Sequence, residues 1–178
     1  MSSARVAKRY ARALLELAAE QGHLEDWGAE LERLARIVAS PELARALTSP
    51  ELQQAQRVEA MTKIAERLEL SFPLRSFAAV LARHGRIDAA EAISEAYQSL
   101  LDERLGRARG QLSFASQPSD DEVARVVAGL EGLVGKKVLV TVKVNPSLLG
   151  GVVAEIGGKI YDASLETRLQ EAQRRLSE

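Results

Sequence analysis

The stretch RARGQLSF, residues 107–114, decides the fold, because the hydrophobic period of the chain changes there. Polar residues alternate along it with apolar or small ones, which is typical of a half-buried β-strand. Before it, apolar residues recur in steps of three and four, which indicates helices. The sequence therefore predicts a mainly α protein, with a six-helix antiparallel bundle in residues 1–105 and a small α+β domain in residues 106–178.

Helix boundaries in residues 1–105 follow from prolines, glycines and capping residues. The first helix spans about residues 3–21 and ends near Gly22, a residue type that commonly follows a helix. Ser-Pro pairs at 40–41 and 49–50, and the stretch 71–73, separate the next helices, since proline suits a first helical turn. Asp88 is predicted to cap the sixth helix, with Glu91 three residues later as its capping-box partner.

The α+β pattern continues after residue 114. Residues 120–134 are predicted to form a helix and residues 137–144 a second strand with valine at every other position. Two short strands, 151–156 and 159–162, are joined at Gly157-Gly158, which is a hairpin signal. Ser164 is expected to cap a last helix. The apolar stripe of that helix consists of Leu165, Leu169, Ala172 and Leu176.

Composition excludes several classes of protein. The 178-residue chain has no cysteine, which excludes disulfides and thiolate metal sites, and its net charge of −1 does not favour binding to a phosphate backbone. No apolar run approaches the roughly 20 residues that span a bilayer. We therefore expect any association with a membrane to occur through a partner or through a surface of the protein.

The first helix carries more apolar surface than one packing contact uses. Its charged residues fall within an arc of roughly 120° on a helical wheel and its apolar residues occupy roughly 240°, whereas a surface helix needs an apolar stripe of about 100°. Two interpretations follow. Either this helix is central in the bundle and buried on two sides, or its surplus face and the fifth helix form a groove for an amphipathic helix of a partner.

The glycine pairs Gly150-Gly151 and Gly157-Gly158 invite comparison with a phosphate-binding loop. Lys159 follows the second pair, but Ile160 stands where such a loop requires serine or threonine before a helix. The two histidines lie in different segments, and no two His fall with Asp or Glu at metal-ligand spacing. We predict no catalytic residue, no cofactor and no metal site.

A basic stripe supports an alternative function, that of a helical adaptor or a nucleic-acid-binding module. Four cations lie close together on the first helix: Arg5, Lys8, Arg9 and Arg12. Aromatic residues make up only 4% of the chain, which leaves little surface for stacking on bases. Binding to DNA or RNA that depends steeply on salt would favour this alternative, whereas salt-insensitive binding to an apolar peptide would favour the groove.

Three stretches resemble a known family. Residues 7–14 read A-K-R-Y-A-R-A-L, Gly85-Arg86-Ile87 follows an apolar helix, and residues 145–152 read N-P-S-L-L-G-G-V ahead of Gly157-Gly158 and I-Y-D-A-S at 160–164. In this order and at this spacing they are similar to the ATP synthase delta (OSCP-type) subunits, with their signature D-P-S-L-I-G-G-[FVL], G-D and I-D-G-S. The chain departs from that pattern at His84, Asn145, Gly158 and Ala163.

The resemblance implies a non-catalytic stator subunit at the cytoplasmic face of the bacterial inner membrane. The N-terminal domain would bind the N-terminal helical segment of an α subunit on the catalytic head, and the C-terminal domain would join the end of the b-subunit stalk. It also implies residues for each region. The groove for the α segment would consist of Tyr10, Ala13, Leu14, Leu17, Phe77, Val80 and Leu81, and the C-terminal family motif, read as shaping its domain, of Pro146, Gly150, Gly151, Asp162 and Ser164.

Overall fold

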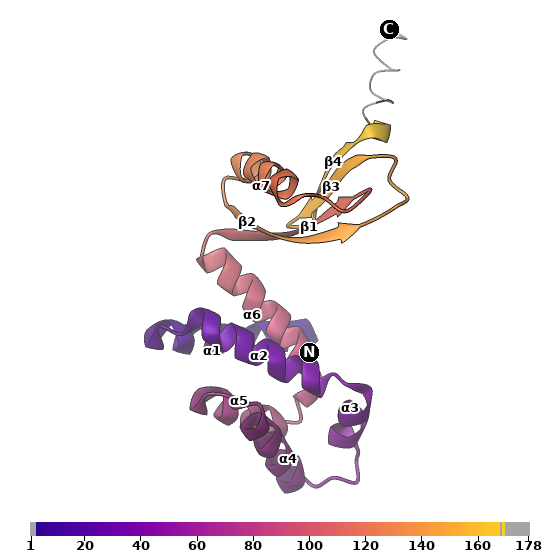
Figure 1. Cartoon of the computed structure of the whole chain (residues 1–178). Coiled ribbons are helices and arrows are strands. Elements are labelled where there is room, and N and C mark those ends of the chain that lie inside the picture. The colour runs from indigo at the N-terminus through magenta and orange to yellow at the C-terminus, as the bar shows by residue number, and fades with distance from the viewer. Residues whose placement is uncertain (1–2, 168, 170–178) are drawn as a thin grey trace. The chain divides into compact units, whose positions relative to one another are not determined.

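The computed structural model of the chain describes residues 3–167 and residue 169. It divides into two compact units between Leu101 and Asp102, a few residues before the division expected from the sequence. Each unit has its own hydrophobic core. In the described residues the chain is mainly helical, with one small sheet near the C-terminal end (Figure 1).

The first unit is built of helices with short connections (Figure 1). In chain order they are α1 (Ser3–Gln21), α2 (Leu24–Val38), α3 (Pro41–Thr48), α4 (Gln54–Arg67), α5 (Phe72–Arg83), the 3₁₀ segment η1 (Ile87–Ala89) and α6 (Ala90–Arg104), whose last residues belong to the second unit. The stretches with helical periodicity in this part of the sequence form helices, but α4 begins at Gln54, so Pro50 lies in the preceding turn and not in a first helical turn as expected.

Asp88 does not cap α6, and this prediction was wrong. The chain first makes the 3₁₀ turn η1, in which the backbone N–H of Ala89 donates to the carbonyl of Arg86 over 3.1 Å. This turn buries Ile87 and Ala89 and leaves Asp88 exposed within it. The packing of two apolar side chains therefore decides how α6 begins.

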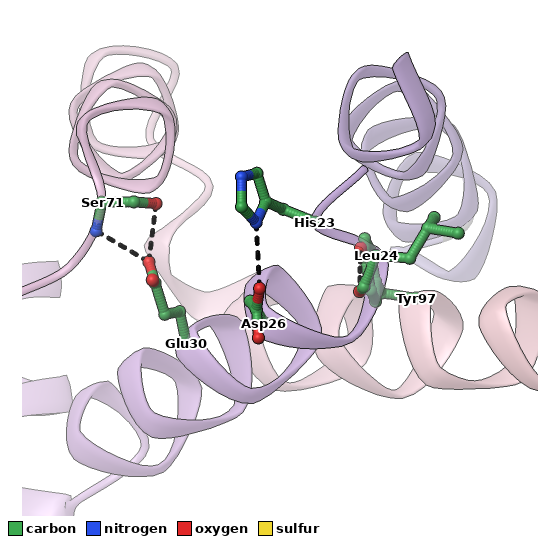
Figure 2. A network of polar contacts seen from close by, with 6 residues as sticks. All are labelled: His23, Leu24, Asp26, Glu30, Ser71 and Tyr97. Carbon is green, nitrogen blue, oxygen red and sulfur yellow. Dashed lines mark hydrogen bonds and ion pairs between the residues drawn. The ribbon is translucent and has the colours of Figure 1, made fainter. Parts of the chain in front are cut away.

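Tyr97 joins α6 to the start of α2 in the core of the first unit. Its ring is fully buried, and its hydroxyl donates to the carbonyl of Leu24 over 2.8 Å (Figure 2). Burial raises the pKa of the Tyr97 hydroxyl to about 12, because the charged form would lose its hydration. Gly28 leaves room for this ring, since a Cβ there would lie 3.1 Å from Tyr97 Cε1.

A carboxylate on α2 fixes the start of α5. Glu30 accepts hydrogen bonds from the backbone N–H of Ser71 over 2.8 Å and from its hydroxyl over 2.7 Å (Figure 2). Ser71 is the residue that precedes α5, and Pro73 occupies its first turn. Because negative charge is favourable at the N-terminus of a helix, this contact holds α5 against α2.

Between the end of α6 and the helix that begins at Leu165, the second unit contains one helix and a four-stranded sheet. The elements are β1 (Arg107–Phe114), α7 (Asp120–Val134), β2 (Lys137–Val144), β3 (Gly151–Ile156) and β4 (Lys159–Ser164). The strand order is β2-β1-β3-β4, with β1 and β2 parallel and the other pairs antiparallel. The parallel pair requires a crossover connection, which α7 provides. The core of the second unit contains Leu112, Leu130, Val138 and Ile156.

Local signals in the sequence determine the ends of α7 and the hairpin. Ser119 and Glu122 form a capping box at the start of α7, and Gly135 ends it with φ +69°. Hydrogen bonds from Ser119 hold the pKa of the Glu122 carboxyl below its ordinary value. The strand β4 runs to Ser164, two residues beyond the prediction. The predicted last helix begins at Leu165, and its stripe residues Ala172 and Leu176 lie outside the described residues.

Candidate functional site: two partner-binding surfaces

Two aromatic side chains connect α1 and α5, the helices predicted to form a groove. The rings of Tyr10 on α1 and Phe77 on α5 meet edge to face, with centroids 6.2 Å apart and planes at 73°. Both rings are half-buried and pack against the core of the first unit. The two helices therefore present neighbouring surfaces.

Much of the broad apolar face of α1 is covered within the first unit. Leu14 and Leu81, both expected in the groove, are 2% and 0% exposed and belong to the core. The other covered residues of α1 are Val6, Ala7, Ala11, Leu15 and Ala18. For these residues the interpretation of α1 as a central helix is the one that fits the structure. The sequence could not decide this, because a helical wheel does not show how many neighbours pack around a helix.

Five of the seven expected residues keep accessible surface. Ala13 is exposed and Leu17 is 49% exposed on α1, while Val80 on α5 is half-buried, like Tyr10 and Phe77. We call these five residues the α1/α5 strip. An exposed leucine on the helix that also carries Tyr10 offers apolar surface that a partner helix could cover.

Cations flank the α1/α5 strip on α1. The Arg9 guanidinium lies 5.7 Å from the centroid of the Tyr10 ring, within the range of a cation–π contact. An open hollow on the same helix is lined by Arg5, Lys8, Arg9, Arg12, Ala13 and Glu16. Ala13 therefore belongs both to the apolar strip and to the charged hollow, so the two surfaces are continuous.

The second unit has an apolar groove that sequence reasoning missed. It lies between α7 and the strands β3 and β4, and we call it the α7 groove. Its lining includes Leu130, Leu133, Val152, Ala154, Tyr161 and Leu165. Leu133 is 73% exposed, and a Cβ at Gly129 or Gly132 on α7 would meet nothing within 4 Å. The sequence offered a weak signal, Gly129 and Gly132 inside a predicted helix, but it did not show that Leu133 is uncovered.

The structure brings four of the five motif residues together where β3 begins and β4 ends. Gly151 pairs with Ser164 across the two strands, and the carbonyl of Gly150 accepts the backbone N–H of Leu165 over 3.0 Å. A Cβ at Gly150 would lie 2.5 Å from Leu165 Cδ1. Pro146 is exposed in the preceding turn and takes no part in these contacts.

Asp162 organises the end of β4. Its carboxylate accepts the backbone N–H of Ser164 over 2.8 Å and the hydroxyl of Thr167 over 2.9 Å. These hydrogen bonds hold its pKa below the ordinary value for aspartate, with the Ser164 backbone as the largest cause. Asp162 and Ser164 therefore direct the chain as it leaves the sheet.

The features considered for catalysis have structural explanations. Gly157 and Gly158, with φ +57° and +78°, form the turn between β3 and β4, and Lys159 opens β4. Nδ1 of His23 lies 2.9 Å from the Asp26 carboxylate at the start of α2 (Figure 2). Within residues 3–167 and 169, no group of three His, Cys, Asp or Glu could hold a metal ion. None of the helices in that part is long and apolar enough to cross a membrane.

Comparison with known proteins gives a consistent result over nearly the whole chain. A family model described as ATP synthase delta (OSCP) subunit matches residues 6–176. ATP synthase subunit delta of Citrifermentans bemidjiense is 35% identical over 174 residues, and that of Anaeromyxobacter dehalogenans 36% over 175, each alignment covering 97% of both chains. A chain in the cryo-EM structure of the Toxoplasma gondii mitochondrial ATP synthase hexamer has a TM-score of 0.68 at 19% identity, covering 97% of both chains, which shows a shared fold.

Proposed function

Because this chain belongs to the ATP synthase delta (OSCP) subunit family, we propose how its two units attach it within that enzyme. Its role is that of a non-catalytic stator subunit, which links the catalytic head to the peripheral stalk and resists rotation during ATP synthesis. Such a role requires durable attachment at two places, and the chain has a candidate surface in each unit.

The α1/α5 strip binds the N-terminal helical segment of an α subunit. The observation that carries this proposal is the exposure of Ala13 and Leu17 on a helix whose other apolar residues are largely buried. The half-buried rings of Tyr10 and Phe77 meet edge to face and add apolar surface on α1 and α5. An amphipathic helix laid along the strip would remove these apolar surfaces from water and keep a fixed register.

The α7 groove receives the C-terminal end of the b-subunit stalk. Its support is an apolar lining between a helix and a sheet, with Leu133 largely exposed at its edge. The open position at Gly129, which lines the groove, allows the backbone of a second helix to come close to α7. The motif around Gly150 and Ser164 shapes the neighbouring end of the sheet.

Two broader features complete the proposal. The helices α1 to α6 form a six-helix antiparallel bundle that serves as the head-binding domain. The protein acts at the cytoplasmic face of a bacterial inner membrane, and it is held there through the other subunits of the complex.

Calorimetric titration tests the head-binding strip. The probe is a synthetic peptide that covers the N-terminal helical segment of the α subunit from the same organism, and we expect one-to-one binding. Ala13→Asp should weaken binding at least about a hundredfold, because the peptide would cover a charge. The new aspartate could pair with Arg9, which lies one helical turn away, but the peptide would then cover two charges, so the loss of affinity should remain.

Ala29→Asp is the matched control, since Ala29 is exposed on α2 outside the strip. It should leave the affinity unchanged within twofold, the usual scatter of such measurements. A peptide that binds Ala13→Asp as tightly as the original protein would exclude the strip as its site. Absence of binding to the original protein would refute the proposal for this unit.

A further inference from the structure

The exposed face of α1 carries its charges in two separate blocks. The first half of the helix bears the cations and the second half the acids. The exposed residues are Arg5, Lys8, Arg9 and Arg12 in the first block, and Glu16 and Glu20 in the second. The face is therefore positive at one end of α1 and negative at the other.

This order opposes the dipole of the helix that carries it. A helix N-terminus has a positive partial charge and favours acidic side chains, while its C-terminus favours basic ones. The first turn of α1 contains no acid and its last turn no base. The arrangement thus costs α1 some stability, and the folding of the first unit does not explain it.

Within the described part of the chain, these charges have no ion-pair partner, neither the four cations nor Glu16 and Glu20. The hollow that the cations and Glu16 line includes Ala13 of the α1/α5 strip. A helix covering the strip would consequently run beside both blocks.

We infer that the helix bound on the α1/α5 strip lies parallel to α1, with acidic residues in its first turns beside Arg5, Arg9 and Arg12 and basic residues in its last turns beside Glu16 and Glu20. This inference rests on the proposed function of the strip and adds the direction and charge pattern of the partner. The apolar strip supplies burial, and the two charge blocks select the orientation.

A parallel arrangement follows from the charges that a helix ordinarily carries. Acids are favourable near the N-terminus of the partner and bases near its C-terminus. If the partner helix lies parallel to α1, its acids lie beside the cations of α1 and its bases beside the acids of α1. If it lies antiparallel, charges of the same sign face each other. The backbone dipoles favour the antiparallel direction, but each end carries only about half an elementary charge, against four full charges in the cationic block.

Cross-linking distinguishes the two directions, because the chain contains no cysteine of its own. Ala4→Cys and Gln21→Cys place single thiols on exposed positions about 25 Å apart along α1. The probe is the same α-subunit peptide, with a cysteine at its first or at its last residue. We expect disulfides to form between Ala4→Cys and the first residue, and between Gln21→Cys and the last. The reverse pairing, or equal yields of all four, would overturn the inference.

Charge reversal gives an independent measurement. Arg12→Glu should weaken peptide binding about tenfold and reduce its dependence on salt, and a peptide with lysines in place of the acids of its first two turns should recover affinity for this variant. Arg33→Glu, an exposed change of equal charge on α2, is the control and should have no effect. If the peptide binds and Arg12→Glu behaves like Arg33→Glu, the inference fails while the function proposed for the strip stands. If no peptide binds, both fail.

Discussion

Gly151 stands at the start of β3, in a position where a side chain has neither a suitable backbone conformation nor space. Its φ is +84°, and a Cβ there would lie 2.5 Å from the carbonyl oxygen of Ala163 and 2.9 Å from Cα of Ser164. Both atoms belong to the backbone of β4, so neither can rotate away as a side chain could. We predict that Gly151→Ala destabilises the second unit by about 3 kcal/mol.

The magnitude combines two costs. A residue with a Cβ in left-handed backbone conformation loses about 1–2 kcal/mol relative to glycine. Relief of the clash requires β3 and β4 to move apart, and overpacking of this kind costs about 1–3 kcal/mol. The loss is large beside the about 5–15 kcal/mol by which a whole domain is stable.

Two other glycines separate these costs. Gly157, in the hairpin turn, has φ +57° and nothing within 4 Å of a Cβ, so Gly157→Ala should lose only the backbone cost, about 1 kcal/mol. Gly132 lies in α7 with equally open surroundings. Gly132→Ala should raise stability by about 0.5–1 kcal/mol, because alanine has the higher helix propensity.

The assay is urea unfolding of the full chain, with amide hydrogen exchange measured in β3 and β4. Fluorescence of Trp27, the single tryptophan, reports the first unit separately. If Gly151→Ala loses no more stability than Gly157→Ala, the argument from the backbone clash is refuted. If it equals the original protein, the left-handed backbone argument is refuted as well.

Two further predictions concern the same unit. Asp162 has a lowered pKa because it accepts hydrogen bonds from Ser164 and Thr167. Its stabilising effect is therefore present above the unfolded pKa of about 3.9 and is lost as pH falls through the folded pKa. Asp162→Asn should reduce the loss of stability in acid below about pH 4, and an unchanged pH profile of the urea midpoint would refute this role. Leu133→Glu should abolish calorimetric binding of a peptide taken from the C-terminal end of the b-subunit stalk. Leu149 has the same 73% exposure but lies outside the α7 groove, so Leu149→Glu should leave this binding intact. Equal effects of the two variants would exclude the groove as the binding site.

Local chemistry explains why much of the fold could be predicted. The alternation in β1 and the valines of β2 place those strands at the predicted residues, and the Ser119 capping box and Gly135 delimit α7. Each of these signals acts within a few residues of the chain. The Gly157-Gly158 turn, too, fixes the β3–β4 hairpin from positions next to one another in the sequence.

Burial depends on neighbours that are distant in sequence, and there the sequence was less informative. The pattern on α1 cannot distinguish Leu14, which the core covers, from Ala13 and Leu17, which stay exposed. The α7 groove was missed for the same reason, because Leu133 belongs to the apolar pattern of its helix and only the position of the sheet leaves it uncovered. Asp88 fits a capping box, yet the burial of its neighbours determines the turn.

The small size of the α1/α5 strip bears on how a stator of this kind holds. Five residues, of which only Ala13 and Leu17 are exposed, offer far less area than the about 800 Å² per partner of a standard interface. Apolar burial on the strip alone therefore does not account for durable attachment, and other contributions are required. The charge pairing that we infer along α1 would supply one. The second anchorage that we propose at the α7 groove would supply another, because a chain held at one end keeps the other end at high effective concentration near its site. Either contact can then reform before the whole protein leaves, so the rate of complete dissociation depends on both surfaces at once.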